Sequence, residues 1–299
     1  MGARPDMSFS SRAARVQYHL LMILFRFAVN RWFYGWFTRG LARFFDPSNA
    51  VIVTLPTGGR FRIALNDGYW TRFALFNREY EPEVGAILRV AAAHTGFFCD
   101  AGANKGYWTS WGSTLFQRIT AVEAASKTFG ALMQNVDGMP NVTCRRAAIY
   151  SVSGRQMSFV NVENSHASAH LGDQPEGGHL EMVETISLDD LVPPGTRAII
   201  KLDVEGAEIE AMRGATRCLA EGSVLIYEDH GADLESETSR YLFELGDMWL
   251  CFAENPTERL TGLKNVQVLK SDRFKGYNFL AARADSPLLA SLLNSFAKD

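Results

Sequence analysis

The stretch with the most evident chemistry is DAGANKG, residues 100 to 106, which follows the apolar run 97–99. Gly102 and Gly106 allow a backbone to turn sharply and to approach a ligand closely. Glu123 ends the next apolar run, about twenty residues further on, where an acid can accept hydrogen bonds from ribose hydroxyls. Together the loop and Glu123 predict a nucleoside-binding crevice.

The type of nucleoside follows from the residues of the loop. A dinucleotide site uses the spacing G-x-G-x-x-G, in which backbone N–H groups surround a pyrophosphate. This loop lacks that spacing, and the carboxylate of Asp100 is poorly suited to a pyrophosphate. It suits a cationic ligand, such as one with an ammonium beside a sulfonium. We therefore predict S-adenosylmethionine as the cofactor; a glycine turn that serves packing alone is the alternative.

A second acidic group lies in IIKLDVEGAEIEAMRG, residues 199 to 214. Asp203 follows an expected strand, and ligands of parallel α/β sheets bind at the carboxyl ends of the strands. Glu205 and Glu208 stand where a helix is expected to begin, and the helix dipole alone favours acids there. Asp203 is therefore the main site candidate of this block.

A third group, Glu228, Asp229 and His230, ends the apolar run SVLIY. An alcohol that attacks a methyl group must lose its proton, and a histidine side chain titrates near neutral pH. We predict His230 as the general base, at the same sheet edge as Asp203. A structural histidine bonded to a neighbouring carboxylate is the alternative.

A divalent metal ion such as Mg²⁺ is a competing way to acidify a hydroxyl group. Asp203, Glu228, Asp229 and His230 offer oxygen and nitrogen atoms that could bind such an ion. Their spacing is not diagnostic, so the metal and the histidine base both stay open.

The hydrophobic pattern predicts the scaffold that positions these residues. Strand-like runs alternate with helical patterns, which is typical of a mostly parallel α/β sheet. The expected strands are 97–101, 118–122, 142–144, 146–150, 198–202, 223–228, 248–252 and 277–282. The expected helices are 105–116, 126–136, 205–213 and 234–246.

Three further segments have readable patterns. Residues 51–65 alternate on both sides of the turn at 57–59, which predicts a β-hairpin. Residues 79–93 predict a helix. Residues 161–182 have no period and predict a long loop, of a kind that often forms a functional lid. The histidines of this loop, which either meet the substrate or are solvated, are His166, His170 and His179.

The first fifty residues have an unusual composition. No acidic residue lies between Met7 and Phe45, where six arginines are interspersed with aromatic residues. Arg26 and Arg31 interrupt the apolar run, whereas a membrane-spanning helix needs about 18 apolar residues or more. Three interpretations remain: a helix at a membrane interface, a helix that forms a homo-oligomer, or a helix packed on its own domain.

Four stretches together resemble the successive motifs of the FkbM-type methyltransferase family: DAGANKGYWT, AVEAASKTFGALMQN, ISLDDL and IKLDVEGAEIEAMRG. The resemblance covers roughly residues 79 to 282. It implies a class I methyltransferase (Rossmann-like) fold with a seven-stranded sheet, and S-adenosylmethionine as methyl donor. The cofactor-binding residues that it implies are Asp100, Gly102, Asn104, Gly106, Tyr107, Glu123 and Asp203, with Glu205 beside Asp203. The family often has proline after the ribose-binding acid, where this chain has Ala124.

The resemblance also suggests a division of the chain. We expect an N-terminal helical segment at 1–50, a hairpin and helix at 51–95, the methyltransferase domain at 96–285 and a tail at 286–299. The net charge of −3 argues against a general nucleic-acid binder. The four cysteines are scattered without a CxxC pair, which indicates buried thiols in a reducing compartment. The expected location is cytoplasmic, peripheral on a membrane if the first segment binds lipid.

The family mostly methylates hydroxyl groups on sugars, glycans or polyketide products. We therefore expect an O-methyltransferase that acts on a carbohydrate hydroxyl, lipid-linked if the N-terminal segment touches a membrane. One alternative is a methyltransferase of a small secondary metabolite or a lipid headgroup. Another is a membrane-associated adaptor with an inactive methyltransferase shell, in which Asp100, Glu123 and Asp203 would have no purpose.

Overall fold

The computed structural model describes residues 6–25, 46, 48–76, 79–162, 170–171, 178–204 and 206–298. The chain divides into two compact units, Met1–Pro82 and Glu83–Asp299, and each is described by itself. None of the helices in these ranges combines the length and the apolarity needed to cross a bilayer.

The first unit contains a three-stranded antiparallel sheet of β1 (Met7–Phe9), β2 (Ala50–Thr54) and β3 (Arg60–Ala64). The pairing of β2 with β3 confirms the hairpin predicted over 51–65. Two helices, α1 (Arg12–Phe25) and α3 (Thr71–Phe76), accompany the sheet. Helix α1 confirms the helical prediction for the start of the N-terminal segment, whereas residues 26–45 lie outside the described ranges.

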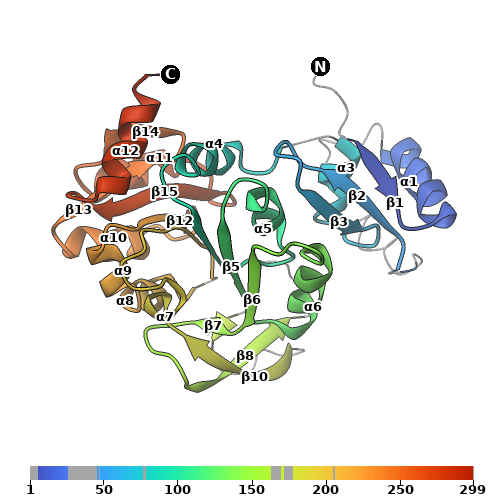
Figure 1. Ribbon diagram of the computed structural model, residues 1–299, viewed down its shortest axis with the longest axis horizontal. Helices are drawn as coiled ribbons and strands as arrows, with labels where there is room; N and C mark the ends of the chain where they lie inside the picture. Colours follow the sequence, from blue (N-terminus) through green and yellow to red (C-terminus); the bar gives the residue numbers. More distant parts are fainter. Residues whose placement is uncertain are drawn as a thin grey trace. The chain divides into compact units, whose positions relative to one another are not determined.

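The second unit is built on an eight-stranded sheet with the order β14-β13-β15-β12-β11-β4-β5-β6 (Figure 1). Its strands are β4 (Phe97–Ala101), β5 (Arg118–Glu123), β6 (Val142–Arg146), β11 (Ile199–Leu202), β12 (Val224–His230), β13 (Met248–Phe252), β14 (Asn255–Arg259) and β15 (Gly276–Arg283). The strands from β12 to β6 run parallel, whereas β15, β13 and β14 pair antiparallel. The mostly parallel sheet is confirmed. The expected count of seven is one too low, because β14 forms an antiparallel pair with β13 at the edge.

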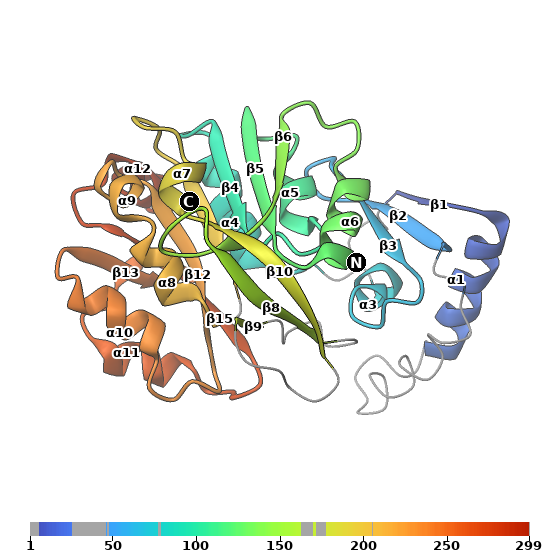
Figure 2. The same cartoon turned by 90° about the horizontal axis from the view of Figure 1, so that it is seen from below.

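Helices lie on both faces of this sheet (Figure 2). They are α4 (Pro82–Ala91), α5 (Tyr107–Gly112), α6 (Ser126–Asn135), α7 (Leu188–Leu191), α8 (Glu208–Arg213), α9 (Thr216–Ala220), α10 (Glu237–Glu244), α11 (Leu263–Leu269) and α12 (Pro287–Phe296). Alternate residues of β4 face the two layers. Cys99 belongs to one buried cluster with Met212 and Cys218, whereas the ring of Phe98 lies 5.3 Å from that of Phe116. Because helices cover both faces of the sheet, every residue of β4 is buried. This explains why the sequence of the strand is continuously apolar as far as Asp100.

A second, smaller sheet with the order β7-β10-β8-β9 lies between β6 and α7 in the chain (Figure 1). Its strands are β7 (Ala148–Ile149), β8 (Gln156–Val162), β9 (His170–Leu171) and β10 (Gly178–Ile186). The prediction of one continuous loop over 161–182 is therefore wrong. Strand β10 pairs antiparallel with β8 along its length, so long-range pairing overrides a composition that is poor in strand-forming residues.

Candidate cofactor and acceptor site

Three residues of the loop after β4 have left-handed backbones: φ is +90° at Gly102, +51° at Asn104 and +84° at Gly106. A Cβ on Gly102 would lie 1.8 Å from the carbonyl oxygen of Asp203. A Cβ on Gly106 would lie 2.6 Å from Cδ1 of Leu132 in α6. Gly102 therefore needs glycine for packing as well as for backbone conformation, whereas at Gly106 the positive φ is the main reason for glycine. The loop lies against the end of β11 and against α6.

Glu123, at the end of β5, is bonded directly to this loop. Its Oε2 accepts a hydrogen bond from the backbone N–H of Asn104 at 3.0 Å, and its Oε1 accepts one from Ala125 at 2.8 Å. Burial raises the pKa of Glu123 to about 7, although these hydrogen bonds act in the opposite direction. A carboxylate oxygen has more than one lone pair, so both oxygens can also accept from ribose hydroxyls. The structure thus brings the glycine loop and the predicted ribose-binding acid together.

Asp100 lies beneath the loop with only 1% of its surface exposed. Its Oδ2 accepts a hydrogen bond from the hydroxyl of Thr109 at 2.5 Å. Burial raises the pKa of Asp100 to about 6, and the charge of Lys201 on the neighbouring strand opposes this shift. Lys201 Nζ donates to Oδ2 of Asp203 at 2.8 Å. Asp100, Lys201 and Asp203 therefore form one charged group at the ends of β4 and β11, and contact of Asp100 with a bound ligand stays a prediction.

Tyr107 is the first residue of α5 and is nearly buried. Its ring packs edge-on against the ring of Trp108, with the centroids 5.0 Å apart. This contact lies in the first turn of α5, directly after the left-handed Gly106. The structure places Tyr107 next to the loop, and its contact with the cofactor stays a prediction.

The four residues considered for a metal ion are not brought together as one site. Asp203 follows β11, whereas Glu228, Asp229 and His230 end β12, where Leu202 stands opposite Tyr227. Asp229 is buried and pairs with Lys270, while His230 is exposed. Among the described residues, no three or more His, Cys, Asp or Glu side chains form a group that could hold a metal ion.

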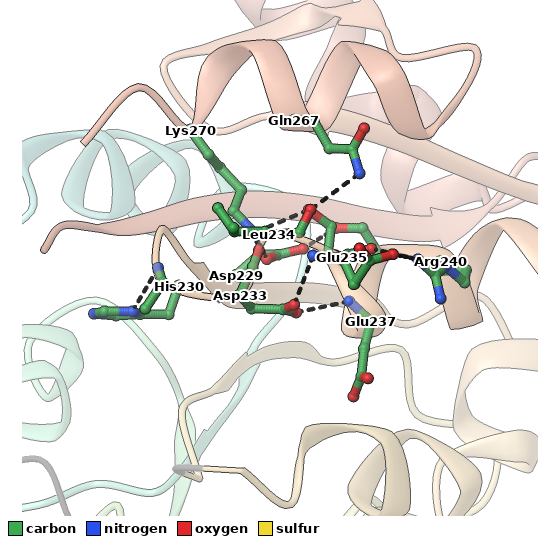
Figure 3. A network of polar contacts seen from close by, with 12 residues as sticks. Asp229, His230, Asp233, Leu234, Glu235, Glu237, Arg240, Gln267 and Lys270 are labelled. Atoms are coloured by element: carbon green, nitrogen blue, oxygen red, sulfur yellow. Dashed lines mark hydrogen bonds and ion pairs between the residues drawn. The ribbon is translucent and has the colours of Figure 1, made fainter. Parts of the chain in front are cut away.

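The ring of His230 is oriented by the loop that follows it. The backbone N–H of Ala232 donates a hydrogen bond to Nδ1 of His230 at 3.1 Å (Figure 3). A ring nitrogen that accepts a hydrogen bond carries no proton, so the neutral imidazole carries its proton on Nε2. In this orientation His230 offers a hydrogen-bond donor to a substrate at Nε2, and Nδ1 is already in use.

Several other predicted residues fall outside the description. Glu205 and His166 lie outside the described ranges. His170 and His179 belong to β9 and β10, and only their backbones are described. Their roles stay predictions.

Three residues close to the site were not predicted as site residues: Lys201 and Thr109 were given no role, and Glu208 was interpreted only as an acid at the start of a helix. Lys201 stands two positions before Asp203, and this spacing alone places both on one face of a strand. Both carboxylate oxygens of Glu208 accept from the N–H of Gly206 at 3.0 Å, and burial raises the pKa of Glu208. Thr109 gave no signal, since its bond to Asp100 depends on how α5 packs on β4.

Comparison with known proteins finds several methyltransferases that are similar to this chain. A curated relative, the hexuronic acid methyltransferase AglP of Haloferax volcanii, is 28% identical over 194 residues, which is 61% of this chain and 80% of that protein. The FkbM methyltransferase structure from Methylobacillus flagellatus has a TM-score of 0.39 and 16% identity, and the match covers 72% of this chain and 54% of that one. The O-methyltransferase from Bacillus cereus in complex with SAH has a TM-score of 0.38 and 15% identity over 69% of this chain and 82% of that one.

A family model described as the methyltransferase FkbM domain matches residues 100–254, which begin at Asp100 and include the glycine loop, Glu123, Asp203 and His230. This match covers just over half of the 299 residues. The chain therefore belongs to the FkbM domain family of S-adenosylmethionine-dependent methyltransferases.

Proposed function

We propose that this enzyme transfers the methyl group of S-adenosylmethionine to a hydroxyl group of a sugar or glycan. The observation that carries the proposal is the direct hydrogen bond between Glu123 and the left-handed loop at Asn104, next to Asp203. The acceptor class is supported by the relative AglP, which is named as a hexuronic acid methyltransferase.

The residues fit the cofactor by their chemistry. Glu123 would accept hydrogen bonds from the ribose hydroxyls, and the loop from Gly102 to Gly106 would bring its backbone close to the ligand. The negative charge of Asp100 and Asp203 suits a cationic ligand. When bound, S-adenosylmethionine supplies an activated methyl group on a sulfonium.

The acceptor is expected beside Asp203 and His230, at the carboxyl ends of β11 and β12. Two residues are candidates to take the proton of the acceptor hydroxyl. His230 would act as a base only if the hydrogen bond from the N–H of Ala232 to Nδ1 is broken, because Nδ1 accepts that hydrogen bond and Nε2 already carries a proton. With the ring as it stands, we propose that His230 Nε2–H orients the acceptor oxygen and that the Asp203 carboxylate receives the proton.

Two variants separate these roles. His230→Gln retains an N–H donor but cannot act as a base, so we expect it to keep most of kcat if His230 orients the acceptor. Asp203→Asn is expected to lower kcat by about 100-fold or more if Asp203 is the base. The assay is methylation of p-nitrophenyl β-D-glucuronide and of neutral p-nitrophenyl glycosides, with product detected by mass spectrometry. Loss of turnover in His230→Gln with near-normal Asp203→Asn would reverse the assignment.

The other acceptors and the adaptor hypothesis are tested when a small phenolic compound and a phospholipid are added to the same screen. Turnover of a small phenolic or a phospholipid headgroup, but of no glycoside, would identify a secondary metabolite or lipid as the acceptor. Cofactor binding without turnover of any acceptor would favour the adaptor.

A second proposal concerns the N-terminal helix, which we infer to lie at an anionic membrane surface. One face of α1 is buried through Ala14, Tyr18 and Leu21. The opposite face is apolar and open to solvent: the exposed fractions are 60% for Val16, 53% for Leu20 and 69% for Ile23. Spacings of four and three residues place these side chains on one helical stripe.

The charge around this stripe favours lipid over a second protein copy. Arg12 and Arg15 are exposed on the same helix, and the sequence has no acidic residue from Met7 to Phe45. Arginines beside an apolar stripe match an anionic headgroup layer above acyl chains. A copy of the same basic helix would instead bring like charges together. Membrane attachment would place the enzyme near lipid-linked glycans.

A further inference from the structure

A polar network outside the cofactor loop surrounds a buried ion pair between Lys270 and Asp229 (Figure 3). The two side chains are 3% and 0% exposed. Lys270 follows α11, and Asp229 lies in β12, one residue before His230. Ser239 donates to Oδ2 of Asp229 at 2.5 Å, and the hydroxyl of Tyr227 lies 2.9 Å from that of Ser239. The carboxylate of Asp229 is thus held on both oxygens.

Lys270 also binds the loop 230–236, which connects β12 to α10. Its Nζ donates to the backbone carbonyl of Asp233 and to the hydroxyl of Ser236, the latter at 2.9 Å. One ammonium therefore joins the end of β12 to the far side of the loop. Gln267, one turn earlier in α11, adds a second anchor through a 3.1 Å hydrogen bond to the carbonyl of Leu234.

Within the loop, backbone contacts lead back to the histidine. The N–H of Asp233 donates to the carbonyl of His230 at 3.0 Å, and the N–H of Ala232 donates to its Nδ1. Gly231 donates to the carbonyl of Lys275 at 2.9 Å, and a Cβ at Gly231 would lie 2.1 Å from the carbonyl oxygen of Asp272. The loop is therefore confined on the α11 side by Lys270 and on the β15 side by residues 272–275.

We propose that Lys270 is a positioning residue that sets the ring orientation and the tautomer of His230. The Lys270–Asp229 pair fixes the carbonyl of Asp233 and thereby the loop that carries Ala232. The N–H of Ala232 then stays hydrogen-bonded to Nδ1 of His230. The ring proton is therefore on Nε2, which donates to the acceptor. That Nε2–H meets the acceptor rests on the proposed function. That Lys270 sets the tautomer of His230 does not depend on any acceptor.

The pair must be removed as a whole to test this. Lys270→Met alone leaves the buried carboxylate of Asp229 without a counter-charge, which strongly destabilises the folded state. The double variant Asp229→Asn/Lys270→Met removes both charges together, and Asn retains an acceptor for Ser239. Lys275→Met is the matched control, because it removes a lysine from a half-exposed ion pair with Glu254 at 3.4 Å in the adjoining segment.

The first readout needs no acceptor. In protein labelled with ¹⁵N-histidine, the ring nitrogens of His230, assigned with His230→Gln, are expected to show the Nε2–H tautomer in wild type and in Lys275→Met. In the folded double variant we expect a mixture of tautomers. An unchanged Nε2–H tautomer there would overturn the proposal, whether or not an acceptor is known.

The second readout is a double-mutant cycle on turnover of p-nitrophenyl β-D-glucuronide. We expect the double variant to lose at least about tenfold in kcat/KM, with the Kd for S-adenosylmethionine unchanged, and His230→Ala to add less than about twofold in that background. If the fold-losses in kcat/KM of the double variant and of His230→Ala multiply when the changes are combined, the pair acts on overall structure and not through His230. If wild type does not turn over the glucuronide, the acceptor assignment fails, and the tautomer measurement still decides the role of Lys270.

Discussion

The Cα of Gly102 faces the backbone carbonyl of Asp203 so closely that a Cβ would lie 1.8 Å from its oxygen. The N–H of Asp203 in turn donates to the carbonyl of Ala101 at 2.9 Å. The cofactor loop and the acidic end of β11 are therefore packed backbone against backbone. A change at either segment is transmitted to the other, which explains why the two are expected to act as one site.

We predict that Gly102→Ala disrupts this packing. The left-handed φ of +90° and the clash with a backbone atom both oppose the new methyl group. Gly154→Ala is the control, because Gly154 has φ +81° and nothing within 4 Å of its Cβ position. Urea unfolding should show a loss of about 1 kcal/mol for the control and at least about 3 kcal/mol for Gly102→Ala. Equal losses would mean that the loop can move away from Asp203 without cost.

Glu123 should make stability depend on pH. Its pKa is raised from 4.5 to about 7 in the folded protein, so folding favours the protonated form. The folded state then binds more protons than the unfolded state between these values, and stability falls as the pH rises through this range. Glu123→Gln removes this titration. The free energy of unfolding of the variant minus that of wild type should therefore increase by up to about 3 kcal/mol between about pH 5 and about pH 8. A constant difference between the two proteins across this range, in urea unfolding, would contradict the raised pKa.

We predict that the positive charge of Lys201 stabilises two neighbouring carboxylates, those of Asp100 and Asp203, at the ends of β4 and β11. Lys201→Met removes the positive charge that opposes the raised pKa of Asp100, so that pKa should rise further. We expect a loss of about 3 kcal/mol at neutral pH, measured by urea unfolding, because a buried carboxylate loses its counter-charge. Asp100→Asn/Lys201→Met should recover part of this loss. Arg283→Met, which breaks ion pairs with the exposed Asp247 and Asp285, should change stability by less than about 1 kcal/mol.

The exposed stripe of α1 should determine membrane binding. Leu20→Gln/Ile23→Gln is expected to abolish flotation with phosphatidylglycerol vesicles while leaving the fold intact, since both side chains are exposed. Phosphatidylcholine vesicles should bind the wild type only weakly. If the variant floats as well as wild type, the membrane proposal fails. Loss of dimers in light scattering, without any flotation of wild type, would assign the stripe to a homo-oligomer.

The core of the fold was largely predictable because its signals are local. The strand expected at 97–101 has the same bounds as β4, and the hairpin at 51–65 follows from alternation around Gly58. Helix α5 begins later than expected, at Tyr107, because Gly106 is left-handed and cannot start the helix earlier.

The parts that were missed depend on contacts distant in sequence. Strand β10 carries Glu181, in a segment whose sequence pattern predicted a loop. The Glu181 side chain forms an ion pair with Arg146 at 2.7 Å and accepts a hydrogen bond from the N–H of Ser126 at 3.1 Å. Likewise, nothing local marks Lys270 as the partner of Asp229, 41 positions away. His230 was identified by its type and place at the strand end, but its tautomer depends on the backbone of Ala232.

The central claim is that the glycine loop and Glu123 form the cofactor site, and calorimetric titration with S-adenosylmethionine tests it most directly. We expect wild type and the exposed-site control Glu258→Ala to bind with a Kd in the micromolar range. Glu123→Ala, which removes the ribose acceptor, should weaken binding by about 100-fold or more while remaining folded. Wild-type affinity in Glu123→Ala, or no binding to folded wild-type protein, would contradict the account.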